Sequence, residues 1–399
     1  MKKDIIDELK ERGLVKQIVF EDELHEILKK GPVTCYCGFD PSRESLTIGN
    51  GVLLAMLLRM AKSGQTPIAL LGGATGRIGD PTGRNDMRPE KTQAQLDYNL
   101  SRIRKQIKDF FALNGVDNVI IVDNDEWTSK LSYYDFLRDI ASQMSVNRML
   151  ASECFKARME NGLTLAEFAY MPMQAYDFLY LMRSKGCILE IGGDDQWGNI
   201  LAGVELIRRK ENKPAFAFTL PLLTKADGTK MGKSAGGAIW LDGTMTSDFD
   251  LFQYFRNSDD VKVAEYFKVL TLLPVDEIEK ICAGKGKEIN AAKERLAYEI
   301  VKLFRGEESA KRALEQAKSA FGGNASDIPE ANIKANETNI VDCLVAVKFA
   351  ASRGDAKKLV LGGGVKVNDE VVSTLDFECP KGSFVLRKGK KTIVKVVVK

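Results

Sequence analysis

Several short segments of the sequence combine glycines with small polar residues, carboxylates or lysines, the residue types that bind nucleotides and amino acids. In the first, Asp40 and Ser42 follow a predicted strand and lead to residues 47–50, Thr-Ile-Gly-Asn, where a helix is predicted to begin. Free backbone N–H groups and the helix dipole favour a phosphate at such a helix N-terminus. Ordinary capping of that helix by Ser45 or Thr47 would explain the same residues, so both interpretations stay open.

A glycine-rich segment follows the next predicted strand. Five glycines fall within residues 72–83 and allow the backbone to approach a ligand closely. Asp80, in the same segment, can receive an ammonium group. The segment has neither the strand-to-helix G-x-G-x-x-G context of a dinucleotide site nor the lysine of a P-loop, which excludes both of those sites. A long surface loop is the alternative.

The helix predicted over 165–183 has a polar stripe on an otherwise apolar surface. Tyr170, Gln174 and Asp177 are spaced i, i+4 and i+7, which places them on one face. A solvated face would be richer in Lys and Glu. The stripe therefore predicts the lining of a pocket.

Two later segments add groups suited to a nucleotide. Residues 190–199, Glu-Ile-Gly-Gly-Asp-Asp-Gln-Trp-Gly-Asn, run from a predicted strand into a helix. Glycines beside carboxylates there suit a ribose hydroxyl and a cation, although a helix-capping turn is the alternative. In the loop 225–234, Lys230 and Lys233 are suited to neutralising charge that develops on phosphates in a transition state. A solvated basic loop would look the same.

The elements that must position these residues alternate between strand and helix. Such alternation predicts an α/β, Rossmann-like fold with a doubly wound parallel sheet, in which ligands bind at the carboxyl ends of the strands. The predicted strands cover residues 33–37, 68–71, 119–122 and 187–191, and the predicted helices cover 49–62, 91–113, 133–141, 165–183 and 197–209.

Beyond the sheet, the pattern becomes helical from residue 248 to 321 and then poor in apolar residues. We expect four regions: an α/β domain (1–225), a lysine loop with an all-helical domain (226–322), a linker (323–338) and a small α+β module (339–399).

Composition excludes several classes of protein. The chain has 399 residues with 44% hydrophobic and 28% charged residues, which rules out global disorder. Its single histidine, His25, falls in a predicted exposed helix, so a catalytic triad or a histidine metal site is not expected. The seven cysteines form no C-x-x-C pair, which indicates reduced thiols in the cytoplasm and no structural zinc.

Charge is distributed unevenly along the chain. The net charge is +3, but residues 340–399 contain twelve Lys/Arg and six Asp/Glu. Clustered cations suit a polyanion because binding releases counterions from phosphates, while a solvated tail is the alternative. No apolar stretch approaches the roughly 18–20 residues of a membrane span. The charged N-terminus lacks the pattern of a targeting segment.

Taken in order, the motifs resemble those of the bacterial-type tyrosyl-tRNA synthetases, a family of class I aminoacyl-tRNA synthetases. The matching segments are YCGFDP, LTIGN, GGATGRIGDPTGR, YMPMQAYDF, IGGDDQWGN and KADGTKMGKS, together with a final RNA-binding segment from residue 351 to 368. One departure stands out, because the family's His-Ile-Gly-His motif reads Thr-Ile-Gly-Asn at residues 47–50.

The resemblance implies that residues 1–225 form the catalytic domain, which binds ATP and tyrosine, that the helical domain within 226–322 binds tRNA, and that 339–399 is an RNA-binding module. It also implies roles for individual residues. The tyrosine site is expected at Tyr36, Asp80, Tyr170, Gln174, Asp177 and Gln196, with Tyr36 and Asp177 on the hydroxyl. ATP is expected at Asp40, Ser42, Gly49, Gly192, Asp195 and Lys233. Catalytic roles are expected for Thr47, Asn50, Arg84, Arg88, Lys230, Lys233 and Ser234. The residues expected to contact tRNA are Arg208, Arg209, Arg353, Lys357 and Lys358.

The resemblance also implies a reaction and its partners. Tyrosine and ATP would give tyrosyl-adenylate and pyrophosphate, and the tyrosyl group would pass to the 3′ end of tRNA(Tyr). Mg²⁺ would accompany ATP, with no metal or organic cofactor bound by the protein itself. The protein would be a cytoplasmic homodimer. A catalytically impaired relative that acts only as an RNA-binding protein is the alternative, suggested by Thr47.

Overall fold

The computed structural model describes residues 4–82, 91–159, 162–234, 237–284, 286–322, 329–334, 337–368, 370–389 and 392–398. The chain divides into two compact units, Met1–Lys311 and Arg312–Lys399, and each is described by itself. Among the described helices, none combines the length and apolar character needed to cross a membrane.

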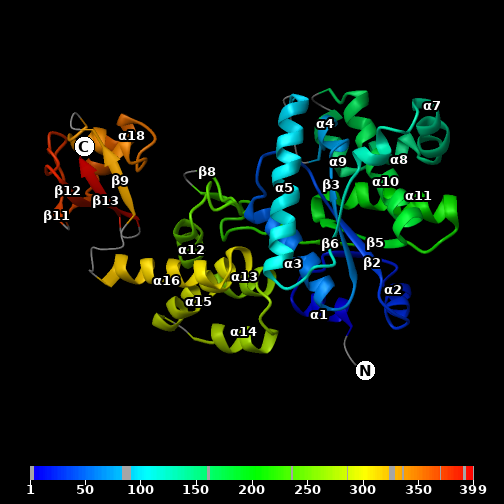
Figure 1. The fold of residues 1–399 in the computed structure, drawn as a ribbon, viewed down its shortest axis with the longest axis horizontal. Coiled ribbons are helices and arrows are strands. Elements are labelled where there is room, and N and C mark those ends of the chain that lie inside the picture. Colours follow the sequence, from blue (N-terminus) through cyan, green and yellow to red (C-terminus); the bar gives the residue numbers. More distant parts are fainter. Residues whose placement is uncertain are drawn as a thin grey trace. The chain divides into compact units, whose positions relative to one another are not determined.

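The first unit is built on a six-stranded sheet, which confirms the predicted α/β fold (Figure 1). All neighbouring strands are parallel except β1, which pairs antiparallel with β6. In spatial order the strands are β1 (Gln17–Val19), β6 (Phe216–Leu220), β5 (Cys187–Gly193), β2 (Thr34–Phe39), β3 (Thr66–Leu71) and β4 (Ile120–Asp123). The strand order reverses between β2 and β5, so a ligand crevice is expected at their carboxyl ends.

Four long helices pack beside the strands of this sheet. Helices α3 (Ile48–Lys62) and α5 (Gln93–Leu113) contact β3, while α10 (Leu165–Lys185) and α11 (Trp197–Glu211) contact β5. Helix α10 begins with a capping box between Thr164 and Glu167 and ends at Gly186, whose φ of 63° suits glycine. These local signals determine where α10 begins and ends.

Shorter elements complete this layer. The helix predicted over 133–141 is interrupted, because α7 is followed by a π-helical turn at Phe136–Ile140 and a 3₁₀ turn at Ala141–Gln143. The remaining short elements are α1 (Ile5–Glu11), α2 (Glu21–Leu28), α4 (Thr75–Ile78), α6 (Asp125–Thr128), α7 (Tyr133–Asp135), α8 (Val146–Leu150), α9 (Glu153–Met159) and a 3₁₀ turn at Asp194–Gln196.

The segment predicted to be helical follows a short hairpin of β7 (Lys233–Ser234) and β8 (Gly237–Ala238). Its elements are α12 (Asp248–Arg256), a 3₁₀ turn at Asp260–Lys262, α13 (Val263–Leu270), α14 (Val275–Cys282), α15 (Lys287–Arg305) and α16 (Glu307–Gly322). Arg59 of α3 is 4% exposed and donates to the carbonyl oxygens of Lys268 and Val269 at the end of α13. Burial lowers the pKa of Arg59 to about 9, and the helix C-terminus provides acceptors for its charge.

The second unit has its own hydrophobic core and a five-stranded sheet. Its strands, in spatial order, are β11 (Glu370–Val371), β10 (Val365–Val367), β12 (Ser383–Lys388), β13 (Thr392–Val398) and β9 (Glu330–Ile333), and its helices are α17 (Ile340–Ala346) and α18 (Arg353–Leu361). Strand β9 falls inside the segment 323–338 that was predicted as a linker, and it pairs parallel with β13. A short strand among polar residues carries no periodic signal that would reveal it.

Candidate active site

A cavity of about 530 Å³ opens at the carboxyl ends of β2 and β5. It is lined by fourteen of the residues expected at the site, which come from five separate sequence segments: Tyr36, Asp40, Ser42, Thr47, Gly49, Asn50, Asp80, Tyr170, Gln174, Asp177, Gly192, Asp195, Gln196 and Lys230. The fold therefore brings together the residues whose spacing suggested a pocket.

Asp177 lies at the buried end of this cavity and is held by two neutral donors. Trp127 Nε1 donates to Oδ1 over 2.8 Å, and Asn124 Nδ2 donates to Oδ2 over 2.9 Å. Burial raises the pKa of Asp177 to about 7, although both hydrogen bonds oppose that shift. Each carboxylate oxygen keeps a lone pair that can accept a further hydrogen bond.

Tyr36 lies beside this carboxylate on β2. The residue is 1% exposed, and its hydroxyl has no hydrogen-bond partner among the described residues. Burial, followed by the neighbouring carboxyl of Glu190, raises the pKa of Tyr36 well above its usual value. The phenol is therefore a neutral donor, and a buried donor without a partner is suited to a polar ligand group.

A second group of polar side chains lies around Asp80, which is 8% exposed. Gln196 Nε2 donates to Asp80 Oδ2 over 2.6 Å, and Asn199 Nδ2 in turn donates to Gln196 Oε1 over 3.1 Å. The backbone N–H of Thr82 donates to the other oxygen of Asp80. This network fixes an anionic group that can accept an ammonium ion.

The first turn of α3 forms another wall of the cavity. Asn50 Oδ1 accepts from the backbone N–H of Thr47 at 3.0 Å and from its hydroxyl at 2.9 Å. Asp40 lies beside the glycine-rich segment, because a Cβ added to Gly72 would lie 2.6 Å from Asp40 Oδ1. Tyr170 Oη donates to Asp40 Oδ2 over 3.4 Å. Thr47, Gly49 and Asn50 line the cavity. The N-terminus of α3 therefore opens into the pocket, as phosphate binding requires.

The segment that contains the lysine loop contacts the first turn of α3. The N–H of Ile48 donates to the carbonyl of Ile239, and Gly232 has a φ of 101° and packs against Ile48. Lys230 lies at the cavity and pairs with Asp195 over 3.3 Å. The backbone of Lys233 and Ser234 forms β7, while their side chains, together with Arg84 and Arg88, lie outside the described part of the chain.

The residues expected to contact tRNA lie in both units. Arg353, Lys357 and Lys358 are exposed on α18, where Arg353 pairs with Asp342. Arg208 contacts Glu23 and stacks on the Phe20 ring, with 3.4 Å between its Cζ and the ring centroid. Arg209 pairs with Glu205. The two arginines of α11 therefore already make internal contacts.

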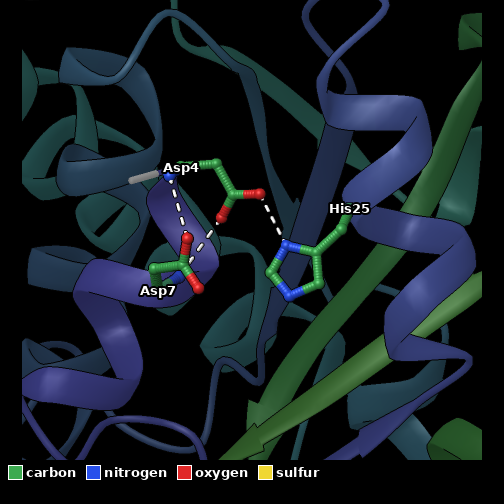
Figure 2. Close-up of side chains that lie close together, drawn as sticks. All are labelled: Asp4, Asp7 and His25. Atoms are coloured by element: carbon green, nitrogen blue, oxygen red, sulfur yellow. Dashed lines mark hydrogen bonds and ion pairs between the residues drawn. The ribbon is translucent and has the colours of Figure 1, made fainter. Parts of the chain in front are cut away.

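One group of side chains outside the cavity has the composition of a metal site, at Asp4, Asp7 and His25 (Figure 2). Figure 2 shows Asp4 pointing toward both His25 and the backbone of Asp7. Asp4 Oδ2 lies 2.6 Å from His25 Nδ1, and Asp4 and Asp7 form the capping box of α1. Helix capping and an ion pair account for all three residues, with no need for a metal.

Among the residues that sequence reasoning missed are Asn124 and Trp127, which donate to Asp177, and Glu190; of these, Asn124 and Glu190 line the pocket. The first two contact Asp177 across about fifty positions of sequence, a relationship that no local pattern contains. Asn124 could have been noticed, because a polar residue directly after a parallel strand lies at the ligand-binding edge of the sheet.

Comparison with known proteins places this geometry among characterised relatives. Residues 28–322 match the model of the class I tRNA synthetases (W and Y), and residues 321–396 match a tyrosine–tRNA ligase C-terminal domain. The chain is 44% identical over 407 positions to a tyrosine–tRNA ligase of Clostridium tetani, covering 100% of both. It is 45% identical to tyrosine–tRNA ligase 1 of Clostridium acetobutylicum, covering 99% of both.

A solved structure is similar in sequence and in fold. The C-terminally truncated mitochondrial tyrosyl-tRNA synthetase of Aspergillus nidulans superposes with a TM-score of 0.72 at 31% identity. The match covers 80% of this chain and 95% of that one.

Proposed function

The chain belongs to the class I tRNA synthetases of the tryptophan and tyrosine group and acts as a tyrosine–tRNA ligase, and we propose that the cavity beside β2 and β5 is its active site. The enzyme activates tyrosine with ATP to tyrosyl-adenylate and pyrophosphate, and then transfers the tyrosyl group to the 3′ end of tRNA(Tyr).

The buried end of the cavity suits the tyrosine hydroxyl. That hydroxyl donates to Asp177 and accepts from Tyr36, which gives a partner to the unpaired phenol. The substrate ammonium then lies near Asp80, Tyr170 and Gln174. The observation that carries this proposal is the arrangement of Asp177, whose two neutral donors keep its carboxylate fixed and leave it able to accept.

This arrangement explains selection against phenylalanine. Phenylalanine would leave the buried groups of Tyr36 and Asp177 without partners, and buried polar groups without partners are costly. Tyrosyl-tRNA synthetases as a group are the standard example of this effect, with discrimination of about five orders of magnitude. A pocket built for a hydroxyl needs no editing site.

The activation step needs positioning and charge stabilisation more than proton transfer. The carboxylate of tyrosine is already a nucleophile and attacks the α-phosphate in line with the departing pyrophosphate. Lys230 and Lys233, with Arg84 and Arg88, stabilise the charge that develops on the phosphates. Asn50 and the N–H groups that begin α3 contribute uncharged donors, with Thr47 positioning Asn50.

Mg²⁺ enters with ATP. Magnesium keeps several waters and binds through phosphate oxygens with few protein ligands. Among the described residues, the one group of three metal-type ligands is Asp4, Asp7 and His25, none of which lines the cavity. We propose that the triphosphate of ATP holds this Mg²⁺.

The proposed homodimer has support from an apolar surface on α8 and α10. Leu165 at the start of α10 is 78% exposed, and Val146 of α8 is 54% exposed. Both line a shallow hollow together with Leu150, Met159, Leu163 and Phe168. Exposed apolar side chains gathered around a hollow are typical of a protein interface.

The second unit supplies three of the proposed tRNA contacts, Arg353, Lys357 and Lys358, while Arg208 and Arg209 belong to the first unit. Lys357 and Lys358 are exposed on α18, and the surrounding sequence carries an excess of cations. A cytoplasmic location agrees with the cysteines, because all seven are free and six are buried.

Amino-acid-dependent exchange between ATP and pyrophosphate, run with each of the twenty amino acids, tests the assigned site. Tyrosine alone should support exchange. Asp177→Ala should lose discrimination against phenylalanine, whereas unchanged discrimination in that variant would contradict the placement of the hydroxyl. Loss of all exchange in a folded wild-type protein that still binds tRNA would favour the RNA-binding alternative.

A further inference from the structure

The pocket contains a second buried carboxyl group, Glu190, which none of the roles above uses. Glu190 belongs to β5 and is the register partner of Tyr36 on β2. It lines the cavity, yet only 2% of the residue is exposed. Ionisable side chains are seldom buried to this extent, and those that line a pocket are candidates for a role in it.

The two oxygens of Glu190 have different surroundings. Gln174 Nε2 donates to Oε1 over 3.1 Å. Oε2 is buried without a hydrogen-bond partner among the described residues, and so is the hydroxyl of the neighbouring Tyr36. Glu190 thus lies between the proposed ammonium ligand Gln174 and the proposed hydroxyl ligand Tyr36.

The packing around Glu190 leaves its side chain little freedom. Helix α11 approaches closely at Gly203, where a Cβ would lie 3.2 Å from Glu190 Oε2 and 3.1 Å from the Phe178 ring. Gly203 thus leaves just enough space for the carboxyl. A side chain confined in this way can fix the orientation of the group that it binds.

The orientation of Gln174 matters for its proposed role. A glutamine amide can bind an ammonium group only through Oε1, because Nε2 is a donor. A carboxylate can only accept, so an ionised Glu190 requires Nε2 to point toward it. The amide oxygen is then directed away from Glu190.

We propose that Glu190 is a positioning residue for tyrosine, whose carboxylate holds Gln174 Nε2 so that Gln174 Oε1 faces the substrate ammonium. The proposal rests on the tyrosine-binding role proposed for Gln174. In this role Glu190 contributes to recognition of the amino group and does not contact the reacting atoms.

A dependence on pH follows from this arrangement. Burial raises the pKa of Glu190 to about 8, although the hydrogen bond from Gln174 and the nearby Tyr36 hydroxyl oppose the shift, and the charge of Asp177 adds to it. The other titratable groups coupled to it are Cys37 on β2 and Cys187 on β5, while Gly203 of α11, which packs against it, has no titratable side chain. None of these groups is cationic.

The raised pKa favours the protonated form of Glu190 in the free enzyme at neutral pH, and a protonated carboxyl can pair with either end of the Gln174 amide. The substrate ammonium favours the ionised form. Tyrosine binding should release the proton of Glu190 to solvent, and the affinity for tyrosine should increase as the pH rises toward about 8.

Glu190→Gln tests this, because it keeps the shape of the side chain and removes the charge. In exchange between ATP and pyrophosphate, the KM for tyrosine should be higher in Glu190→Gln than in the wild type. The ratio of the two KM values should be smallest at pH 6.5 and reach about tenfold at pH 8.5, with kcat little changed. The ratio of the two KM values cancels the titration of tyrosine itself. Calorimetry in two buffers should show proton release on tyrosine binding in the wild type and less in Glu190→Gln.

Gln174→Ala separates this proposal from the assignment of the site. A wild-type KM in Gln174→Ala would overturn the ammonium site itself. The role of Glu190 alone would be overturned by a different pair of results. These are a raised KM in Gln174→Ala and a ratio of the Glu190→Gln KM to the wild-type KM that does not change from pH 6.5 to 8.5. Glu190→Met, which lacks any hydrogen-bonding group, should raise the KM at both pH values, and thermal melting of each variant verifies folding.

Discussion

Asn50 Oδ1 accepts two hydrogen bonds from Thr47, one from its backbone N–H and one from its hydroxyl 2.9 Å away. The two residues that replace the histidines of the family motif therefore act as a unit. Because the amide oxygen of Asn50 is occupied, its Nδ2 group is directed elsewhere and stays available as a donor. In a pair of histidines, each ring would donate independently of the other. Here the orientation of the Asn50 donor depends on Thr47.

Removal of the Asn50 amide should impair activation more than binding. Asn50→Ala is expected to lower kcat for exchange by about 100-fold, the usual loss for one donor to a transition state, while the KM for tyrosine stays near that of the wild type. Thr47→Val should show a smaller loss, and Thr47→Ser should retain most activity because it keeps the hydroxyl. Equal activity in Thr47→Val and Thr47→Ser would contradict the positioning role.

The donors to Asp177 should control the pH profile of tyrosine recognition. The pKa of Asp177 is about 7 even with both hydrogen bonds. Trp127→Phe keeps a ring to stack on Tyr180 but removes the indole donor, so the pKa should rise further. The KM for tyrosine at pH 7 should increase about tenfold, and the midpoint of kcat/KM against pH should move upward. An unchanged midpoint would show that Asp177 does not titrate in this range.

The ion pair between α1 and α2 should make stability depend on pH. Burial lowers the pKa of His25, but the hydrogen bonds to Asp4 and Glu21 outweigh it and raise the pKa above its usual value. The stabilisation is therefore fully present below the usual histidine pKa of about 6.5 and is lost as the pH rises through the folded-state value. Thermal melting of wild type and His25→Gln should differ most at pH 5.5 and converge at pH 9; an equal gap at both pH values would contradict this.

The apolar hollow beside α8 and α10 should be needed for dimerisation. Leu165→Glu is expected to shift the protein from dimer to monomer in light scattering coupled to gel filtration, because a charge would be buried without a partner. Val261, 79% exposed and outside the hollow, provides the control Val261→Glu, which should stay dimeric. A dimer that persists in Leu165→Glu would place the interface elsewhere.

The lysines of α18 should affect tRNA and leave activation unchanged. In Lys357→Ala/Lys358→Ala, exchange should match the wild type, while the Kd for tRNA rises and the slope of log Kd against log salt falls by about one to two. Lys105→Ala, an exposed lysine of the first unit, serves as the control. Unaltered tRNA affinity in the double variant would remove α18 from the RNA-binding surface.

The sequence predicted the parts of this molecule that local periodicity encodes. The stripe of Tyr170, Gln174 and Asp177 follows from helix geometry alone, and all three residues line the cavity. Buried strands such as β3 are continuous apolar runs, which identify them directly. Segments that end a parallel strand and begin a helix could be placed at one edge of the sheet from the sequence alone.

What the sequence did not predict depends on contacts between distant residues. Strand β1 has only three residues and exists because it pairs with β6. The helix predicted over 133–141 is present, but its winding changes from α to π at Phe136 and to 3₁₀ at Ala141, which the sequence pattern did not indicate. Asn124 and Trp127 acquire their roles only through Asp177, which lies fifty or more positions away.

The anchoring of α13 by Arg59 restricts how the enzyme can close around ATP. Arg59 lies on the helix whose other end begins at the nucleotide site, and its buried guanidinium binds the last carbonyls of α13, while Arg12 binds the carbonyl of Leu273 just beyond. Hinge motion at this joint would expose a buried cation and break several hydrogen bonds together. The joint between α3 and α13 is therefore expected to stay rigid when ATP binds.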